Sequence, residues 1–179
     1  GEDGALYILQ ARPETVKPRR KAGVLITYSL RARGEPLVRG LSVGSAIATG
    51  TVCRIDRPDE IGRFRDGAIL VTGKTDPDWV PLMRRAAGIV TDEGGRTSHA
   101  AIVCRELGMP AVIGTGDATR VLGEGRPVTL SCAEGGDQGV VYDGTLPFER
   151  AEVRLDEVPA TRTRVMVNVA SPAAALQWW

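Results

Sequence analysis

Three short apolar runs alternate with helix-like segments in the middle of the 179-residue chain. The runs Ala68–Thr72, Gly88–Thr91 and Ala111–Ile113 have the length and composition of strands that are covered on both faces. Parallel neighbours in a sheet need a crossover connection, which a helix usually supplies. The alternation therefore predicts an α/β fold with a mostly parallel central sheet and right-handed crossovers.

Local signals place the two helices between these runs. Asp76 is followed by proline, the order typical of an N-cap and a first helical residue, and this helix is expected to span about 76–87. A second helix is expected at about 98–107. Gly108 and Pro110 follow it and are typical of a helix end.

Further strands are expected on both sides of this unit. They are residues 37–43, 46–55, 128–131 and 140–142. Gly40, Gly44 and Gly50 fall in or beside the first two of these strands. Glycines at such positions predict bends or bulges in a tightly curved sheet.

The chain has the organisation of a middle domain taken from a longer protein. Residues 37–144 form the self-contained unit. The segments 17–36 and 145–164 are charged and contain proline, so we expect linkers there. Strand-like sequences lie within the end segments 1–16 and 165–179.

The charge balance does not indicate a nucleic-acid or membrane-surface partner. The chain has 23 basic and 22 acidic residues, a formal net charge of +1. No apolar run approaches the ~20 residues of a membrane span. The charged residues Glu2 and Asp3 are unlike a signal peptide. We expect a cytoplasmic protein with no nucleic-acid or membrane partner.

The cysteines Cys53, Cys104 and Cys132 are widely spaced. An odd number at such spacing is unlike a disulfide framework. The close cysteine spacing of zinc sites is missing as well. The sequence therefore predicts buried, reduced cysteines and no metal ligand.

The one histidine of the chain, His99, follows a turn that joins a buried strand to a helix. Gly94 and Gly95 can take positive φ and let a bulky ligand approach the backbone. Thr97 is the expected N-cap, which places His99 in the first helical turn. The free N–H groups and the positive dipole end there favour an anion and disfavour imidazolium. His99 is therefore expected to be neutral and nucleophilic near pH 7.

Arg96 completes this segment, because its guanidinium can pair with phosphate oxygens. These features together predict a histidine that carries a phosphoryl group. The alternatives are a histidine that only caps the helix and a general acid or base. For the latter no partner serine, cysteine or carboxylate motif is evident.

Residues 94–105, with the sequence GGRTSHAAIVCR, resemble the phosphohistidine signature of the PEP-utilising enzymes. The flanking residues 75–81 and 106–114 fit this family too, and Cys104 stands where the family usually has a small residue. The resemblance implies a three-layer, swivelling β/β/α phosphohistidine domain with His99 as the carrier. The residues expected to support its phosphate are Gly94, Gly95, Arg96, Thr97 and Ser98.

The two ends of the chain extend the resemblance. Residues 6–15 resemble the last strand of an ATP-grasp nucleotide domain, in which Gln10 and Arg12 match positions that face the ATP phosphates. Residues 161–172 resemble the opening of a PEP/pyruvate-binding barrel. Segments 1–16 and 165–179 are then pieces of these domains, which are the implied partners within one full-length protein.

Within the family, the chain is most similar to members that make PEP from ATP, pyruvate and water. The resemblance implies Mg²⁺ and ATP as cofactors of the full-length enzyme, neither bound by this segment alone, which is not expected to turn over. It also makes Thr97 the candidate target of a regulatory kinase/phosphorylase. The alternatives are a dikinase that uses phosphate instead of water, an antibiotic phosphotransferase, and a non-catalytic docking module.

Overall fold

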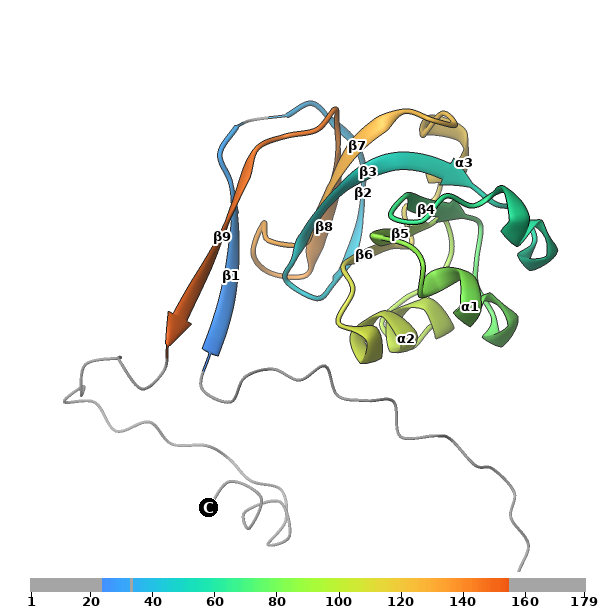
Figure 1. Ribbon diagram of the computed structural model, residues 1–179, viewed down its shortest axis with the longest axis horizontal. Helices are drawn as coiled ribbons and strands as arrows, with labels where there is room; N and C mark the ends of the chain where they lie inside the picture. The colour runs from blue at the N-terminus through green and yellow to red at the C-terminus, as the bar shows by residue number, and fades with distance from the viewer. Residues whose placement is uncertain (1–23, 33, 155–179) are drawn as a thin grey trace, which may run out of the picture.

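The computed structural model describes residues 24–32 and 34–154 (Figure 1). Within these ranges seven strands close into a barrel, and helices pack against its outside. In barrel order the strands are β2 (Pro36–Val43), β6 (Ala111–Ile113), β5 (Gly88–Thr91), β4 (Ile69–Thr72), β3 (Ile47–Arg54), β7 (Pro127–Ser131) and β8 (Gln138–Asp143). The fold is therefore mixed α/β with strands dominant.

The prediction of a mostly parallel sheet is wrong for this barrel. The pairs β3–β4, β4–β5 and β5–β6 are parallel. The pairs β2–β6, β2–β8, β3–β7 and β7–β8 are antiparallel. The parallel strands β3, β4, β5 and β6 follow one another in the chain, and each connection between them contains a helix. Strands β7 and β8 are joined by a short loop, which permits only antiparallel pairing.

The helices are short. They are η1 (Pro58–Arg63), η2 (Pro77–Trp79), α1 (Val80–Met83), α2 (His99–Leu107) and α3 (Ala118–Val121). Asp76 caps η2 as predicted, because its side chain accepts a hydrogen bond from the Asp78 N–H. The helix predicted over 76–87 ends early, at Met83. Beyond it the Arg85 carbonyl accepts a hydrogen bond from the Gly67 N–H, and the Ala87 N–H donates to the Ala68 carbonyl. These backbone groups therefore pair with the segment before β4 and do not continue the helix.

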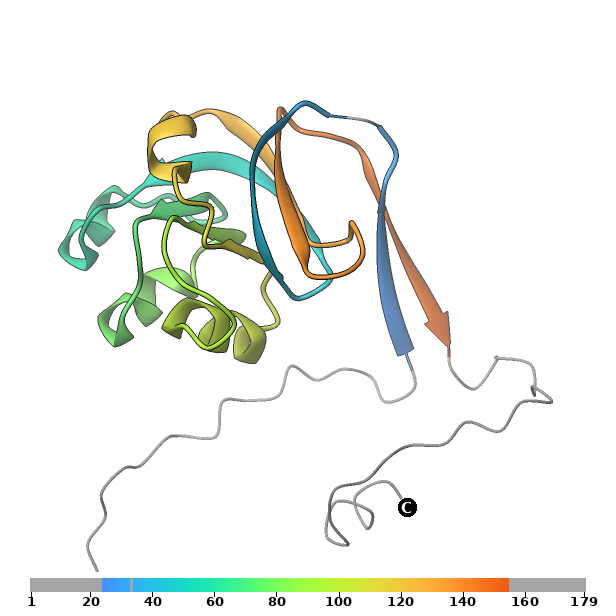
Figure 2. The ribbon, with the colours of Figure 1, turned by 180° about the vertical axis from the view of Figure 1, so that it is seen from behind.

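Two apolar cores flank the parallel strands, and the short helices α1 and α2 gather on one side of these strands (Figure 2). One core takes residues from all seven barrel strands, including Ile69, Val71 and Val90, and it fills the barrel. The other core contains Leu70 and Ile89 and lies under α1 and α2. Successive residues of β4 thus point into different cores, which confirms that the apolar runs are covered on both faces.

Glycines allow the barrel to close tightly. A Cβ on Gly40 of β2 would lie 2.6 Å from the Ile113 carbonyl oxygen, and a Cβ on Gly139 of β8 would lie 2.8 Å from Val112 Cγ2. Neither contact is tolerable, so the chains approach closely only because these positions lack a side chain. The predicted bend or bulge at Gly40 is not what is seen there: the glycine allows a close approach of strands, and the register shift of β2 lies between Pro36 and Val38.

A two-stranded ribbon stands beside the barrel (Figure 1). Strand β1 (Val24–Leu30) pairs antiparallel with β9 (Phe148–Arg154), and Val24 lies opposite Arg154. The rings of Tyr28 and Phe148 lie 6.2 Å apart. Both strands fall within the segments expected to be linkers, so that expectation missed them. The division into domains stays a prediction, and the strand-like ends of the chain lie outside the described residues.

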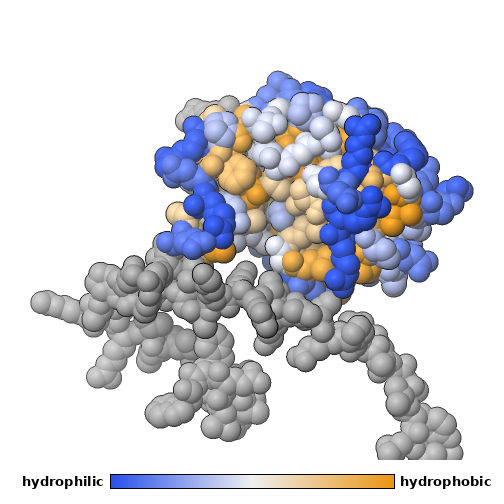
Figure 3. Space-filling model, viewed as in Figure 1, coloured by the Kyte–Doolittle hydropathy of each residue, from blue (hydrophilic) through white to orange (hydrophobic). Residues whose placement is uncertain are grey.

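The surface and the cysteines of the described residues can be compared with the predictions from the sequence. On the face shown in Figure 3, apolar patches are broken up by hydrophilic residues. Ile102 on α2, 37% exposed, is the exposed large hydrophobic residue of the described chain. Cys53, Cys104 and Cys132 are free and buried, as predicted. In residues 24–32 and 34–154 no helix is long and apolar enough to cross a membrane.

Candidate functional site

His99 is the first residue of α2, which follows β5 and a seven-residue loop. The N-cap is Ser98 rather than the predicted Thr97. Ser98 has extended backbone angles, its hydroxyl accepts a hydrogen bond from the Ala101 N–H at 3.4 Å, and it donates to the Gly95 carbonyl at 2.8 Å. The N-cap is therefore one residue later than predicted, but His99 still lies in the first turn of α2, as expected.

The two glycines of the loop have different roles. Gly94 has φ +117, and a Cβ there would lie 3.0 Å from Ile113 Cγ2 and from Ser98 Oγ. This position therefore requires glycine, both for its conformation and for its packing. Gly95 does not have positive φ, and nothing lies within 4 Å of where its Cβ would be. A ligand can approach the backbone at Gly95.

The imidazole of His99 contacts a residue that follows the neighbouring strand. Its Nδ1 lies 3.0 Å from the Thr75 hydroxyl. Thr75 follows β4, and β4 and β5 are parallel neighbours, so the segments after both strands meet at one edge of the sheet. Thr75 was not among the residues predicted for the site, although the adjacency of the two strands could have indicated it.

Burial lowers the pKa of His99 below its ordinary value of 6.5. The carboxylates of Asp76 and Glu106 act in the opposite direction, and desolvation prevails. The expectation of a neutral imidazole near pH 7 agrees with this direction. Burial is the main cause of the lowered pKa, whereas the prediction from the sequence rested on the helix N-terminus alone.

Arg96 is not bonded to His99 in the described structure. Its guanidinium pairs with the carboxylate of Asp137, in the loop before β8. Its carbonyl accepts a hydrogen bond from the Arg105 guanidinium at 2.8 Å. Thr97 is exposed beside it. Gln10 and Arg12, the other predicted site residues, lie outside the described residues.

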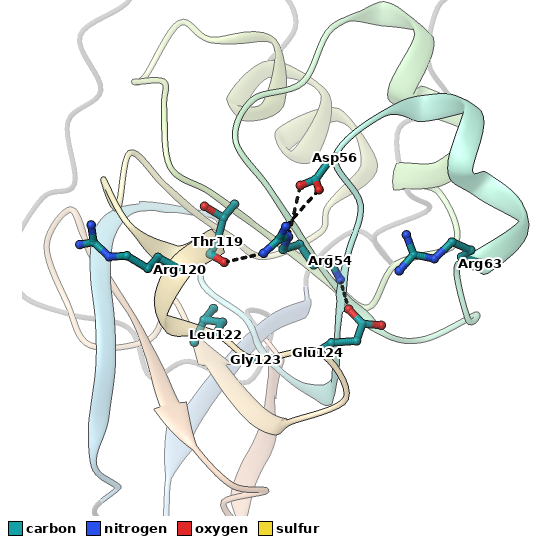
Figure 4. A pocket seen from close by; sticks show the side chains of 8 residues that line it. All are labelled: Arg54, Asp56, Arg63, Thr119, Arg120, Leu122, Gly123 and Glu124. Carbon is teal, nitrogen blue, oxygen red and sulfur yellow. Dashed lines mark hydrogen bonds and ion pairs between the residues drawn. The ribbon is translucent and has the colours of Figure 1, made fainter.

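A pocket opens at the carboxyl ends of β4 and β5, and neither His99 nor Thr75 is among the residues that line it. Its volume is about 380 Å³, and Lys74, Asp76, Trp79 and Glu93 are among its lining residues. A second hollow of about 240 Å³ lies around Arg54 (Figure 4). The Arg54 guanidinium in this hollow already has hydrogen-bond partners, because it donates to both carboxylate oxygens of Asp56 and to the Thr119 carbonyl.

The described residues do not fit a metal ion. Across 24–32 and 34–154, no three His, Cys, Asp or Glu side chains are grouped closely enough to hold one. No step through Mg²⁺ is therefore assigned to these residues. What the arrangement can do is present one neutral imidazole at a helix N-terminus, where an anion is stabilised.

The part of the chain around His99 is similar to a known family. Residues 64–135 match the family described as PEP-utilising enzyme, mobile domain. The match contains η2, α1, the glycine turn, His99 and all of α2.

The curated relatives of this chain include phosphoenolpyruvate synthases. Those of Deinococcus radiodurans and Synechocystis sp. are 52% identical over 179 residues and 46% identical over 175 residues. The alignments cover 99% and 98% of this chain but 23% and 21% of the relatives. The Escherichia coli relative is 45% identical, with 99% and 22% covered. The chain thus spans about a fifth of the length of these relatives.

One similar solved structure is the solution structure of the Enzyme I protein nEIt. It is 30% identical and covers 45% of this chain and 33% of that chain. Its TM-score of 0.37 is too low to support a conclusion about the overall fold.

Proposed function

We propose that His99 is the phosphoryl carrier of a phosphoenolpyruvate synthase, a phosphotransferase of which this chain is the central part. The relatives with this name align over nearly the whole chain. The observation that carries the proposal is the placement of His99. Its ring is at the N-terminus of α2, is kept neutral by burial, and has Nδ1 3.0 Å from the Thr75 hydroxyl.

The Thr75 hydroxyl can donate to Nδ1 or accept from it, and the proposed carrier uses the second arrangement. When Nδ1–H donates to the Thr75 oxygen, the ring lone pair is on Nε2. No described residue bonds to Nε2, so this nitrogen is free to attack phosphorus. As the N–P bond forms, the bond from phosphorus to its leaving oxygen breaks. The ring then becomes cationic, and Thr75 continues to accept the Nδ1 proton.

The N-terminus of α2 stabilises the group that is added. The first N–H groups of a helix have no intrahelical acceptor, and they point toward an anion at that end. His99 and Ala100 contribute these groups, since the Ala101 N–H is taken by Ser98. The open space at Gly95 leaves room for phosphoryl oxygens.

The full reaction needs parts outside the described residues. In the proposed cycle His99 attacks the β-phosphorus of ATP, takes the pyrophosphoryl group and releases AMP. Hydrolysis then releases the terminal phosphate, and the remaining phosphoryl group passes to pyruvate to give PEP. ATP and Mg²⁺ would act with an ATP-grasp domain that ends within 1–16 and contains Gln10 and Arg12. Pyruvate would bind a barrel that begins within 165–179. This domain would swivel between them, and the chain alone is not expected to turn over.

The decisive experiment uses the full-length protein and ATP labelled at the β-phosphorus. We expect an acid-labile, base-stable label that maps to His99. Undiminished labelling of a His99→Ala variant would refute the proposal and favour a docking module. With γ-labelled ATP, release of labelled phosphate indicates water as acceptor, whereas labelled pyrophosphate indicates a dikinase that uses phosphate.

We also propose that Thr97 is a regulatory phosphorylation site. Its side chain is exposed, and it lies two residues before His99. A phosphate there would repel the incoming phosphates of ATP. Treatment of the full-length protein with its cognate regulatory kinase, followed by mapping, tests this. Modification elsewhere, or none, would count against Thr97.

A further inference from the structure

The ion pair between Arg96 and Asp137 connects the loop of His99 to the loop between β7 and β8. Both side chains are exposed, at 63% and 66%. Both backbones are fixed: the Arg105 guanidinium holds the Arg96 carbonyl, and the Ser42 N–H donates to the Asp137 carbonyl at 2.8 Å. The side chains can therefore move while their loops stay in place.

Asp137 and Thr75 approach the site from opposite sides. In the barrel order Thr75 follows β4, on one side of β5, whereas Asp137 precedes β8, beyond β6 and β2 on the other side. His99 is bonded to Thr75 and Arg96 to Asp137. The cation closest in sequence to His99 is thus occupied by a carboxylate.

We propose that Asp137 is a positioning residue that holds Arg96 while His99 is unloaded and releases it to the phosphoryl oxygens when His99 is loaded. An exposed ion pair contributes little, so it exchanges easily. A guanidinium can bind two phosphate oxygens at once, and a phosphoryl group has more charge than a carboxylate. The exchange needs only a side-chain movement. This inference rests on the proposed function of His99.

The test measures the equilibrium of loading in the full-length protein. The fraction of His99 that is phosphorylated is determined at a fixed ratio of PEP to pyruvate, in the parent and in Asp137→Asn, Arg96→Gln and the double variant. We expect Asp137→Asn to raise the loading constant about two- to fivefold, because Arg96 no longer has a competing carboxylate. Arg96→Gln should lower it about tenfold or more.

The double variant decides whether Asp137 acts through Arg96. It should match Arg96→Gln alone, because the carboxylate then has no partner to hold. Asp137→Glu should retain the parent value. Asp59→Asn is the control, since Asp59 forms a similarly exposed pair with Arg57 away from the site, and it should change nothing.

Three results would overturn the inference. They are an unchanged constant in Asp137→Asn, a lowered constant like that of Arg96→Gln, or an equal effect of Asp137→Asn with and without Arg96. A parent protein that is not phosphorylated at all would instead refute the proposed function. The two failures are therefore distinguishable.

Discussion

The Thr75 hydroxyl lies 3.0 Å from Nδ1 of His99, and the two residues are 24 positions apart in the chain. This contact joins the segments that follow two parallel strands, β4 and β5. It orients the ring, and when the hydroxyl oxygen accepts the Nδ1 proton, the lone pair of the neutral ring is on Nε2. The chemistry proposed for His99 therefore depends on a neutral hydroxyl as well as on the imidazole.

Replacement of Thr75 by valine should slow phosphorylation of His99 about 10- to 100-fold, the effect of removing a hydrogen bond to a group that becomes charged. Thr75→Ser keeps the hydroxyl and should retain most of the rate. Rapid-quench measurement of label on His99 tests this. Equal rates in the valine and serine variants would show that the hydroxyl has no role in orienting the ring.

The pH dependence should follow the lowered pKa of His99. Because burial holds this pKa below 6.5, the neutral form of the ring is the major form at pH 6.5, and the decline in phosphoryl acceptance should be centred at a lower pH. His99 is the one histidine of the chain, so its NMR titration is unambiguous. A midpoint at or above 6.5 would contradict this prediction.

The same shift links pH to stability. Below pH 6.5 the unfolded chain binds more protons at His99 than the folded chain does. The free energy of unfolding should therefore fall as pH decreases from 6.5 toward the lower folded pKa, and be insensitive to this group above 6.5. A His99→Gln variant should lose that part of the slope. If the slope is unchanged in the His99→Gln variant, the pH dependence arises from other groups.

The strand runs at the centre of the fold could be predicted because local composition determines them. Residues 88–91 and 111–113 form strands with the predicted bounds. Barrel closure could not be predicted, since it depends on pairs such as Leu41 with Ile113 that are distant in sequence. Strand β9 is charged and resembles a linker, and its partner β1 lies more than a hundred residues earlier.

The site shows the same division between local and distant information. The glycine turn and the approximate start of the helix follow from adjacent residues, whereas the lowered pKa of His99 depends on its burial in the fold. Thr75 and Asp137, which bind His99 and Arg96 from 24 and 41 positions away, depend on strand order. The N-cap was misplaced by one residue, because Thr97 and Ser98 are equally suitable by type, and only the backbone angles distinguish them.

Ser98→Ala should lower the free energy of unfolding by about 1 kcal/mol, through loss of the cap of α2. Thr97→Ala is the matched control and should change it by no more than about 0.5 kcal/mol, since the side chain is exposed and caps nothing. Urea denaturation measures both. A larger loss in the Thr97 variant would place the cap where the sequence predicted it.

The three cysteines should resist thiol reagents in the folded protein. Burial raises the pKa of Cys104 to about 12 and that of Cys132 to about 11, and it also raises the pKa of Cys53. The reactive thiolate is therefore scarce at pH 8. A colorimetric thiol assay should detect almost no cysteine under native conditions and all three in denaturant. Rapid reaction of any one of them in the native state would contradict its burial.

Barrel closure should be sensitive to a single methyl group at Gly40. A Cβ there would lie 2.6 Å from the Ile113 carbonyl oxygen, which belongs to the neighbouring strand and cannot easily move. Gly40→Ala should therefore lower the free energy of unfolding by about 1–3 kcal/mol. Gly62→Ala is the control, because nothing lies within 4 Å of that Cβ and its φ is not positive, so its effect should stay within about 0.5 kcal/mol. If the two variants unfold at the same urea concentration, close approach at Gly40 does not limit closure, and the curvature of β2 has another origin.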